Sequence, residues 1–390
     1  MDFAFSPAEE AFRQEIRWWL ADNLPAGWVY KGIGVEQGAH SVDIMREWQR
    51  KLYEAGWLKL TWPVEQGGRG ASSVMKVIYD EEMLRAGAPP ILGSIGVSML
   101  VPTLLAYGTD WQKETYVERL LSGELIFCQG FSEPNAGSDL AGLRAKALRR
   151  DGKWYLSGQK IWSSQAAHSD YSFFLARTQP IDPERPHAGI GFFLLDLHQT
   201  AVDVRPIEQM TGGDEFCEVF ATDAVVEDRD VVPGDGWKIA MATFGFERGY
   251  RAHPERIRRA ADACAQLVRN RGLGTDPITR QKVAQAHIEA HVYRLNALRA
   301  LTSMAKGIAP GPEMSLAKLG WSEIDRRLQD SAVEAEGMYA ALDPASDHAL
   351  EGGRWQNAWM WGFAGTIYAG SSEIQRNIIA ERVLGLPRSR

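Results

Sequence analysis

The sequence has few cysteines, and their spacing indicates neither disulfide bonds nor a metal site. Only Cys128, Cys217 and Cys264 occur in 390 residues, so they are odd in number and far apart. This pattern excludes a disulfide framework and a zinc cluster. We therefore expect reduced, small apolar side chains in a cytoplasmic protein, because the cytosol keeps thiols reduced.

Long apolar runs and an excess of basic charge are missing too. No stretch approaches the roughly 18 uninterrupted apolar residues of a membrane span, so no span is expected. The amino terminus, MDFAFSPAEEAFRQEIRWWL, carries early acidic residues and lacks the apolar core of a signal peptide. Lys and Arg number 43 against 50 Asp and Glu, a net charge of −7. This mild acidity argues against a nucleic-acid partner.

Several common catalytic patterns are also absent. The chain contains no Walker loop, no HExxH and no GxSxG. Gly32-x-Gly34 lacks the third glycine of a dinucleotide-binding loop. His287 and His291 have the spacing of helical metal ligands, but no clear third ligand accompanies them. We expect a surface or core histidine pair and no bound metal.

What the chain does contain is helical patterning at both ends and β patterning between them. Ser6 and Glu9 fit a capping box with Pro7 at the first helical position, and Asp151-Gly152 separates two short runs as in a β-hairpin. Apolar spacing predicts helices near 7–24, 41–55, 236–270, 277–306, 312–339 and 371–385, with further helical patterns over 73–123. Strands are predicted near 143–148, 153–156, 171–176, 191–197, 202–205 and 218–221. We predict an α+β protein with an N-terminal helical domain (1–124), a middle β domain (125–232) and a C-terminal helical bundle (233–390).

Four segments could carry chemistry, and each also has an ordinary structural interpretation. FSEPNAGSD (131–139) is a polar loop that could present backbone N–H groups to a ligand. GQKIWSS (158–164) places an indole beside hydroxyls, which suits a flat heteroaromatic ring or simply a buried tryptophan. FERG (246–249) pairs a carboxylate with a guanidinium, usually surface decoration. YAGSSEIQR (368–376) leads from a turn into a helix start, which favours an anion or is only a cap.

Together and in this order, the segments resemble motifs of the acyl-CoA dehydrogenase family of flavoenzymes. SEPNAGSD is similar to the family pattern T-E-P-x-A-G-S-D, and GQKIW is similar to G-x-K-x-W. The stretch from IQRN to Glu381-Arg382 resembles the carboxy-terminal I-Q-R pattern, and Trp62-Pro63 with Gly67-Gly68 also matches. The resemblance covers nearly the whole chain. It implies an N-terminal helical domain, a β-barrel-like middle domain and a C-terminal four-helix bundle.

The resemblance implies FAD as cofactor and assigns residues to it. The first loop would contribute to the flavin and substrate sites, the second segment would flank the flavin ring, and the carboxy-terminal turn would contact the rest of FAD. An arginine after the first long carboxy-terminal helix would reach the FAD phosphates of a neighbouring subunit, although the family's Arg-x-x-Phe-Gly reads RNRGLG here, and its Gln-x-x-Gly-Gly is represented only by Glu336-Gly337-Met338. The expected cofactor residues are Gln129, Phe131, Ser132, Trp162, Ser164, Arg269, Arg271, Ser371 and Glu373.

The expected identity of the catalytic base depends on a position where this chain departs from the family pattern. Many members carry a Glu in a Tyr-Glu-Gly turn before the last helix, but this chain reads Tyr368-Ala369-Gly370. A subset carries the Glu on the long helix directly before a common Arg, and Glu247 precedes Arg248 here. The resemblance therefore implies Glu247 as the base for the α-proton, with hydride transfer from the β-carbon to flavin N5 and a trans-2-enoyl-CoA product. The expected substrate-binding residues are Ser138, Arg248, Ala369 and Gly370.

The motifs are similar to those of bacterial members that act on bulky or steroid-derived CoA thioesters. That group includes assemblies of two different chains, so both a homotetramer and an α2β2 heterotetramer are expected possibilities, with an electron-transfer flavoprotein as acceptor. Two alternatives remain open at this point. The chain could be a flavin-dependent oxidase or monooxygenase of the same fold, or a non-catalytic subunit of a heteromeric dehydrogenase.

Overall fold

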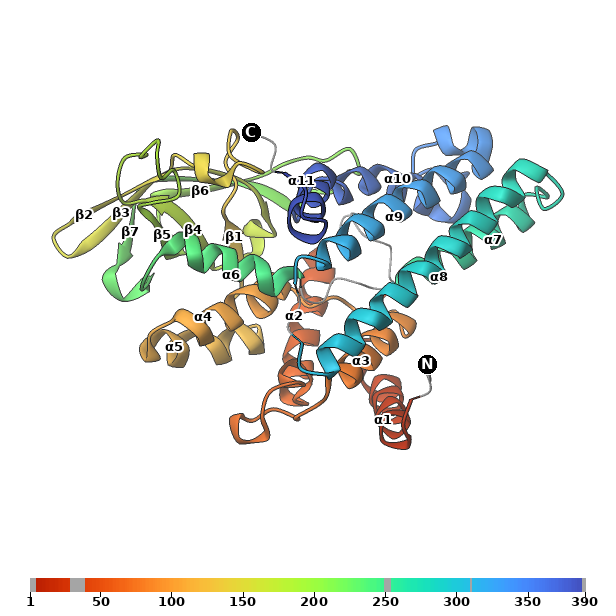
Figure 1. The fold of residues 1–390 in the computed structure, drawn as a ribbon, viewed down its shortest axis with the longest axis horizontal. Helices are drawn as coiled ribbons and strands as arrows, with labels where there is room; N and C mark the ends of the chain where they lie inside the picture. Colours follow the sequence, from red (N-terminus) through yellow and green to blue (C-terminus); the bar gives the residue numbers. More distant parts are fainter. Residues whose placement is uncertain (1–4, 29–38, 249–253, 309–310, 388–390) are drawn as a thin grey trace. The chain divides into compact units, whose positions relative to one another are not determined.

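A computed structural model describes residues 5–28, 39–248, 254–308 and 311–387, without the side chains of Ala39, His40, Glu247 and Arg248. The chain divides into two compact units (Figure 1). One, which we call the sheet unit, comprises Glu36–Lys59 and Pro89–Glu247. The other, the helical unit, comprises Met1–Val35, Leu60–Ala88 and Arg248–Arg390.

The sheet unit is built on an eight-stranded sheet of order β6-β7-β3-β2-β4-β5-β8, with β1 paired in parallel to β4. Figure 1 shows α4, α5 and α6 grouped on one side of this sheet. The strands are β1 (Phe127–Gly130), β2 (Lys146–Arg150), β3 (Lys153–Ser164), β4 (Tyr171–Arg177), β5 (Ile190–Asp196), β6 (Val202–Pro206), β7 (Phe216–Glu227) and β8 (Val231–Val232). The helices are α2 (Ala39–Glu54), α4 (Val101–Tyr107), α5 (Asp110–Ser122) and α6 (Gly236–Arg248), whose last residue is assigned to the helical unit.

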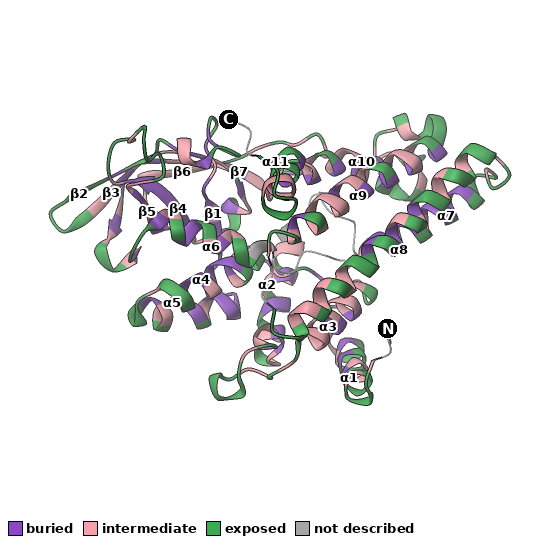
Figure 2. Ribbon diagram, viewed as in Figure 1, coloured by how far each residue is buried: buried purple, intermediate pink, exposed green. Residues whose placement is uncertain are grey.

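Local sequence explains the sheet. Asp151 and Gly152 both have positive φ, +49° and +75°, as a two-residue hairpin turn between β2 and β3 requires. The central strands β4 and β5 are buried along almost their whole length (Figure 2), so they read as continuous apolar runs. Between them, Phe173 and Phe192 stack with ring centroids 5.9 Å apart. A core cluster that contains Phe174 and Phe193 also includes the free, buried thiols of Cys128 and Cys217.

The helical unit consists of packed helices around a second core. Its helices are α1 (Pro7–Asn23), α3 (Ser73–Arg85), α7 (Pro254–Asn270), α8 (Pro277–Ala305), α9 (Met314–Glu336), α10 (Arg354–Gly365) and α11 (Ser372–Ile378). Helix α7 packs against α8 and α9, and α10 packs against α9. Buried Cys264, Leu267, Leu328 and Trp355 lie in the shared core. Among the described residues, no helix has the length and apolar character needed to cross a membrane.

Most predicted elements are confirmed, with several differences. The capping box of α1 is present, since the Ser6 side chain accepts from Glu9 N and the Glu9 side chain accepts from Ser6 N. Strands β1 and β8 and helix α10 were absent from the prediction, and β3 and β7 run for 12 residues each where four were predicted. The single helix predicted over 236–270 is described as α6 and α7, with Pro254 at the first position of α7, where proline is favoured. Residues 249–253, which the prediction placed inside that helix, lie outside the described residues, as do Gly32 and Gly34.

Candidate active site

Strand β1 delivers the first predicted site residues. Phe131 follows β1 and is buried, with edge-to-face contacts to Phe173, Phe192 and Phe244 at centroid distances between 5.4 and 5.9 Å. Gln129 lies on β1 itself, paired in register with Phe173. Its Nε2 atom is buried and has no hydrogen-bond partner among the described residues. A buried amide without a partner marks a place where a ligand could complete the hydrogen bonding.

The loop after β1 is tied to β3 through its backbone. The Ser132 carbonyl accepts a hydrogen bond from Ile161 N at 3.0 Å, and Glu133 and Ala136 exchange two backbone hydrogen bonds of 3.0 Å. Ser132 is half-buried, whereas Ser138 near the end of the loop is exposed. The first predicted segment therefore offers one hydroxyl beside the sheet and one at the surface.

A buried ion pair locks this loop to the second predicted segment. Lys160 on β3 has no exposed surface, and its Nζ donates to Glu133 Oε1 at 2.8 Å and to the Phe131 carbonyl at 3.1 Å. The Glu133 carboxylate also accepts from Arg144 N and Ala145 N at 2.6 and 2.9 Å. Burial lowers the pKa of Lys160 to about 8, although Glu133 acts in the opposite direction. The pair joins the loop, β3 and the segment that enters β2.

Trp162 is presented to solvent by an irregular backbone. The register between β3 and β7 shifts between Lys160 and Ser163, and Trp162 lies inside this irregularity with φ +62°. Its side chain is 56% exposed and meets Phe216 edge-to-face at 6.1 Å. Ser163 is fully buried, and its hydroxyl has no hydrogen-bond partner among the described residues; Ser164 is half-buried. An exposed indole in a left-handed conformation is costly without a function, because only glycine adopts that region freely.

The predicted base and its neighbour cannot be located at side-chain level. Helix α6 ends at Arg248, so the backbone of Glu247 and Arg248 belongs to its last turn. Their side chains lie outside the described residues.

The turn before α11 is strained and held by one side chain. Ala369 has φ +54° and Gly370 has φ +85°. Buried Gln375 donates from Nε2 to the carbonyls of Ala369 and Gly370 at 3.2 and 3.3 Å. A Cβ atom on Gly370 would collide with this amide. Gln375, the Gln of the predicted I-Q-R pattern, thus fixes the turn of the two predicted substrate residues.

Ser371 caps α11 and Glu373 lies in its first turn, but the two side chains differ in how free they are to contact a ligand. The Ser371 hydroxyl accepts from Ile374 N at 3.3 Å and so caps the helix. The Glu373 side chain is 77% exposed and lies 3.7 Å from the Arg376 guanidinium. Hydrogen bonds from its own backbone N–H and from Ser371 lower the pKa of Glu373.

The arginines predicted for the FAD phosphates already have contacts. The exposed Arg269 donates to Gln266 Oε1 at 3.0 and 3.3 Å. The Arg271 Nη2 donates to the carbonyl of Glu336 at 3.4 Å, and its guanidinium lies 4.7 Å from the Tyr339 ring centroid.

Glu336, which the sequence placed near the family's second FAD segment, is a buried acid. Its side chain has no exposed surface, and neither carboxylate oxygen has a hydrogen-bond partner among the described residues. Burial, with a smaller contribution from Glu351, raises the pKa of Glu336 to about 7, and Arg271 acts in the opposite direction.

The predicted residues therefore fall into two sets. The sheet unit holds Gln129, Phe131, Ser132, Ser138, Trp162 and Ser164, and the helical unit holds Arg269, Arg271, Ala369, Gly370, Ser371 and Glu373. Sequence reasoning quoted Glu133, Lys160 and Gln375 within motifs but gave them no role. A signal for the ion pair was present, since a lysine buried on a strand needs a carboxylate as partner and Glu133 stands in the neighbouring motif.

Comparisons with known proteins cover almost the whole chain. Family models described as the acyl-CoA dehydrogenase N-terminal, middle and C-terminal domains match residues 6–124, 128–224 and 234–384. The acyl-CoA dehydrogenase IpdE1 of Mycolicibacterium smegmatis is 40% identical over 97% of this chain and 98% of its own length. The chain belongs to the acyl-CoA dehydrogenase family. It is an oxidoreductase of this type.

Solved structures agree with this assignment. The ChsE4-ChsE5 complex from Mycobacterium tuberculosis matches with a TM-score of 0.84 and 29% identity, covering 100% of both chains. A structure described as the Tcur3481-Tcur3483 steroid ACAD matches with a TM-score of 0.86 and 28% identity, again over 100% of both chains. The three-domain fold of the family is thus the fold of this chain.

Acyl-CoA dehydrogenases are flavoproteins, so the residues can be tested against FAD. In the sheet unit they fit a flavin ring, because an exposed indole can pack on a flat heteroaromatic ring while the Gln129 amide and Ser163 hydroxyl lack partners. In the helical unit, Arg271 fits the FAD phosphates poorly, whereas the exposed Arg269 contacts a neutral partner, Gln266. Arg271 is engaged with the Glu336 carbonyl and Tyr339, and a buried carboxylate stands beside it.

Proposed function

We propose that the protein catalyses FAD-dependent α,β-dehydrogenation of an acyl-CoA thioester to the trans-2-enoyl-CoA. The observation that carries the proposal is the exposed Trp162, held at φ +62° next to the buried, partnerless hydroxyl of Ser163. Strained backbone persists where function requires it. A flavin ring packed on this indole would use the geometry that the Lys160–Glu133 pair maintains.

The following residues are proposed to bind the cofactor. Gln129, Phe131, Ser132, Trp162 and Ser164 would hold the flavin ring, and Ser371 with Glu373 would contact the remainder of FAD. Bound FAD would supply the two-electron acceptor for the β-hydrogen.

Glu247 is proposed as the base that removes the α-proton. Ala369 occupies the turn where many relatives carry a glutamate, and an alanine side chain cannot accept a proton. An α-proton of a thioester is weakly acidic, so the base needs help. Burial against an apolar acyl chain would raise the pKa of the Glu247 carboxyl and make it a stronger base. The Ala369 N–H would stabilise the negative charge that develops on the thioester oxygen.

The substrate is proposed to be a bulky, ring-bearing CoA thioester. The support is the similarity to a protein described as a steroid ACAD and the 40% identity to IpdE1. Ser138, Arg248 and Gly370 are proposed on the substrate side. An electron-transfer flavoprotein in the cytoplasm would reoxidise the flavin, and the domain limits 1–124, 125–232 and 233–390 remain our proposal.

The assembly is proposed to be an α2β2 heterotetramer in which this chain supplies the base. The support is the engagement of Arg271 and the buried acid Glu336, which together leave the helical unit poorly suited to the FAD phosphates. The related ChsE4-ChsE5 structure is itself a complex of two differently named chains. A homotetramer is the competing assembly.

The test is a product analysis with a panel of CoA thioesters. Purified protein with FAD and an artificial electron acceptor is offered straight-chain acyl-CoA and steroid side-chain CoA substrates. We expect an enoyl-CoA that has lost two hydrogens, formed faster from the ring-bearing thioesters. Product formation that consumes oxygen in the absence of any other acceptor would instead indicate an oxidase.

A further inference from the structure

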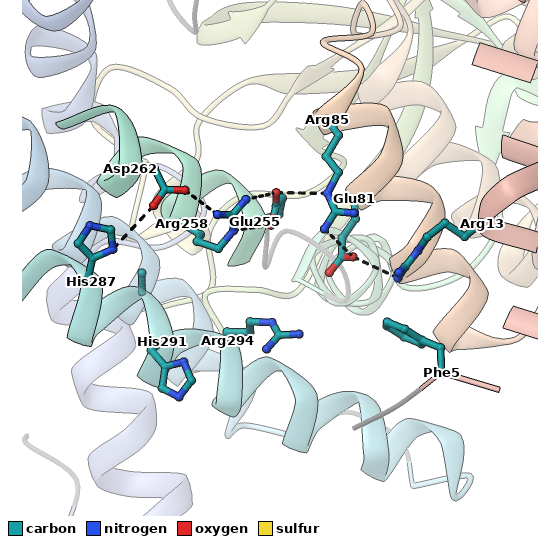
Figure 3. A pocket seen from close by; sticks show the side chains of 11 residues that line it. Phe5, Arg13, Glu81, Arg85, Glu255, Arg258, Asp262, His287, His291 and Arg294 are labelled. Atoms are coloured by element: carbon teal, nitrogen blue, oxygen red, sulfur yellow. Dashed lines mark hydrogen bonds and ion pairs between the residues drawn. The ribbon is translucent and has the colours of Figure 1, made fainter. Parts of the chain in front are cut away.

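A charged pocket of about 440 Å³ lies inside the helical unit, and the proposed reaction makes no use of it. It is formed by α1, α3, α7 and α8, and Figure 3 shows side chains from these helices converging on it. Four arginines line it: Arg13, Arg85, Arg258 and Arg294. His287 and His291, the pair noted in the sequence, also line it from one face of α8.

The acidic side chains of the pocket are already neutralised by neighbours. Glu255 is buried and accepts from Arg258 at 2.7 and 2.9 Å and from Arg85 at 3.4 Å. Burial tends to raise the pKa of Glu255, but these guanidinium groups outweigh it and the pKa is lowered. Asp262 accepts from Arg258 at 2.5 Å and lies 3.9 Å from His287 Nδ1.

Glu81 is the least closely paired of the three carboxylates. Its carboxylate lies 3.7 Å from Arg13 and 3.8 Å from Arg85, which is beyond hydrogen-bond distance. Burial raises the pKa of Glu81, with the arginines acting in the opposite direction. Four guanidinium groups thus face three carboxylates among the lining residues. Among the lining residues alone, the guanidinium groups outnumber the carboxylates by one. Behind the lining, Glu82 accepts from Arg17 and from Arg85 at 2.9 Å each and lies 3.4 Å from Arg13, which also donates to Glu10 at 3.2 Å. With Arg17, Glu10 and Glu82 counted, the basic and acidic groups balance.

Two guanidinium groups keep donors available for a ligand. The Nη2 atom of Arg13 is buried and has no hydrogen-bond partner among the described residues. Within the same described ranges, Arg294 forms neither a side-chain hydrogen bond nor an ion pair within 4.0 Å. Figure 3 shows its guanidinium directed across the pocket toward the side where Arg13 and Phe5 lie. The Phe5 ring packs 4.4 Å from the Arg13 guanidinium and provides an apolar wall.

We propose that this pocket binds a small molecule through an oxyanion, a carboxylate or a phosphate, held between Arg294 and Arg13. Planar guanidinium donors match the geometry of such groups and are the strongest neutralising partners that side chains offer. The guanidinium of Arg294, which has no ion pair within 4.0 Å among the described residues, favours an anion, and the apolar surface of Phe5 and Ala290 can contact the body of the ligand.

The experiment is calorimetric titration of the full chain with two probes, inorganic phosphate and succinate, at constant ionic strength near about 0.15 M. The variant is Arg294→Gln, which breaks no ion pair among the described residues and so leaves the fold intact. The matched control is Arg299→Gln, because Arg299 is also exposed on α8 but does not line the pocket. We expect saturable binding that weakens about tenfold or more in Arg294→Gln, since a hydrogen bond to a charged group contributes at least that much. Arg299→Gln should bind as the wild type does.

The proposal is overturned if neither probe binds saturably, or if Arg294→Gln and the wild type bind equally well. Repeating the titration with coenzyme A present distinguishes the source of the oxyanion. Competition that disappears in Arg294→Gln would assign the site to a phosphate of the thioester substrate. Unchanged affinity would assign it to a separate small acid. Binding does not depend on catalysis, so failure here would leave the proposed dehydrogenase activity untouched.

Discussion

Lys160 Nζ lies 2.8 Å from Glu133 Oε1, and this pair joins two sequence motifs that are 27 positions apart. The lysine has no exposed surface, and the carboxylate is 9% exposed. Each motif looks like a separate ligand-binding segment in the sequence. In the folded chain the charged residue of one motif is the counter-ion of the other, so the two segments form one rigid element beside Trp162.

Lys160→Met should therefore destabilise the protein and weaken FAD binding. Removal of one partner leaves Glu133 charged and buried, at a cost of about 3–5 kcal/mol. Glu133→Gln in the same chain should recover part of this loss, since it removes the buried charge and its single amide oxygen still accepts from one of the two backbone N–H groups of Arg144 and Ala145. Lys153→Met is the control on the same strand, because the Lys153–Glu227 pair is about half-exposed and should contribute about 1 kcal/mol or less. Thermal melting and FAD titration measure both effects. Equal costs for the two lysine variants would contradict the assignment.

Gln375→Leu should impair turnover more than stability. Loss of its Nε2 releases the carbonyls of Ala369 and Gly370, and the strained turn can relax. Removal of a preorganised donor for a developing oxyanion costs about 100- to 1,000-fold, and a displaced donor should cost part of that, about tenfold in kcat. Steady-state kinetics separates kcat from KM. A variant that binds a thioester normally and turns it over at the wild-type rate would exclude the positioning role.

Ala369→Gly should stabilise the protein by relieving backbone strain in the same turn. Alanine at φ +54° adopts a conformation that costs roughly 1–2 kcal/mol for an L-residue, while glycine adopts it freely. The added entropy of glycine in the unfolded chain offsets part of this gain, so we expect a net stabilisation of about 0.5–1 kcal/mol. A lower melting temperature than the wild type would show that the Ala369 methyl group makes packing contacts that outweigh the strain.

The stability of the helical unit should fall as the pH rises from about 4.5 to 7 because of Glu336. The folded-state pKa of about 7 lies above the ordinary value of 4.5, so the folded protein binds more protons in this window. Stability from this group is present at low pH and is lost as the pH rises through 7. Glu336→Gln should remove the dependence and stabilise the protein at pH 8 by about 2–3 kcal/mol. Melting curves across pH measure it, and equal destabilisation by the variant at pH 5 and pH 8 would refute it.

FAD content should depend on a partner chain. Because the helical unit already engages Arg271 with Glu336 and Tyr339, the chain expressed alone should bind less than one FAD per chain. Co-expression with a related chain that carries the phosphate-binding arginine should raise the ratio. The absorbance spectrum of each purified preparation gives the number. Full flavin content in the chain alone would favour the homotetramer.

Local patterns were sufficient for elements defined by neighbouring residues. The capping box at Ser6 and the turn at Asp151-Gly152 are interactions between residues at most three positions apart, and both are present. Strand β1 was missed because its four residues are too short to show a period, and its partner is β4, more than forty positions later. Helix α10 was missed although its sequence, RWQNAWMWGFAG, is rich in apolar residues.

The sequence indicated candidate site residues but not their contacts. The motifs indicated which hydroxyls and aromatic rings to consider, whereas the roles of Lys160 and Gln375 depend on partners fixed only by folding. The burial of Glu336 is likewise a tertiary property. The sequence showed that an acid stands near a family FAD segment, but not that its oxygens lack partners.

The most direct test of the account is rapid anaerobic mixing of the FAD-loaded protein with its best CoA thioester, following the visible flavin band. The wild type should lose this absorbance as the flavin accepts two electrons. Glu247→Gln should retain its FAD and its affinity for the thioester, but lose absorbance at least about 100-fold more slowly, because general-base catalysis contributes roughly 100- to 10,000-fold. Absorbance loss at nearly the wild-type rate in Glu247→Gln would contradict the proposed mechanism.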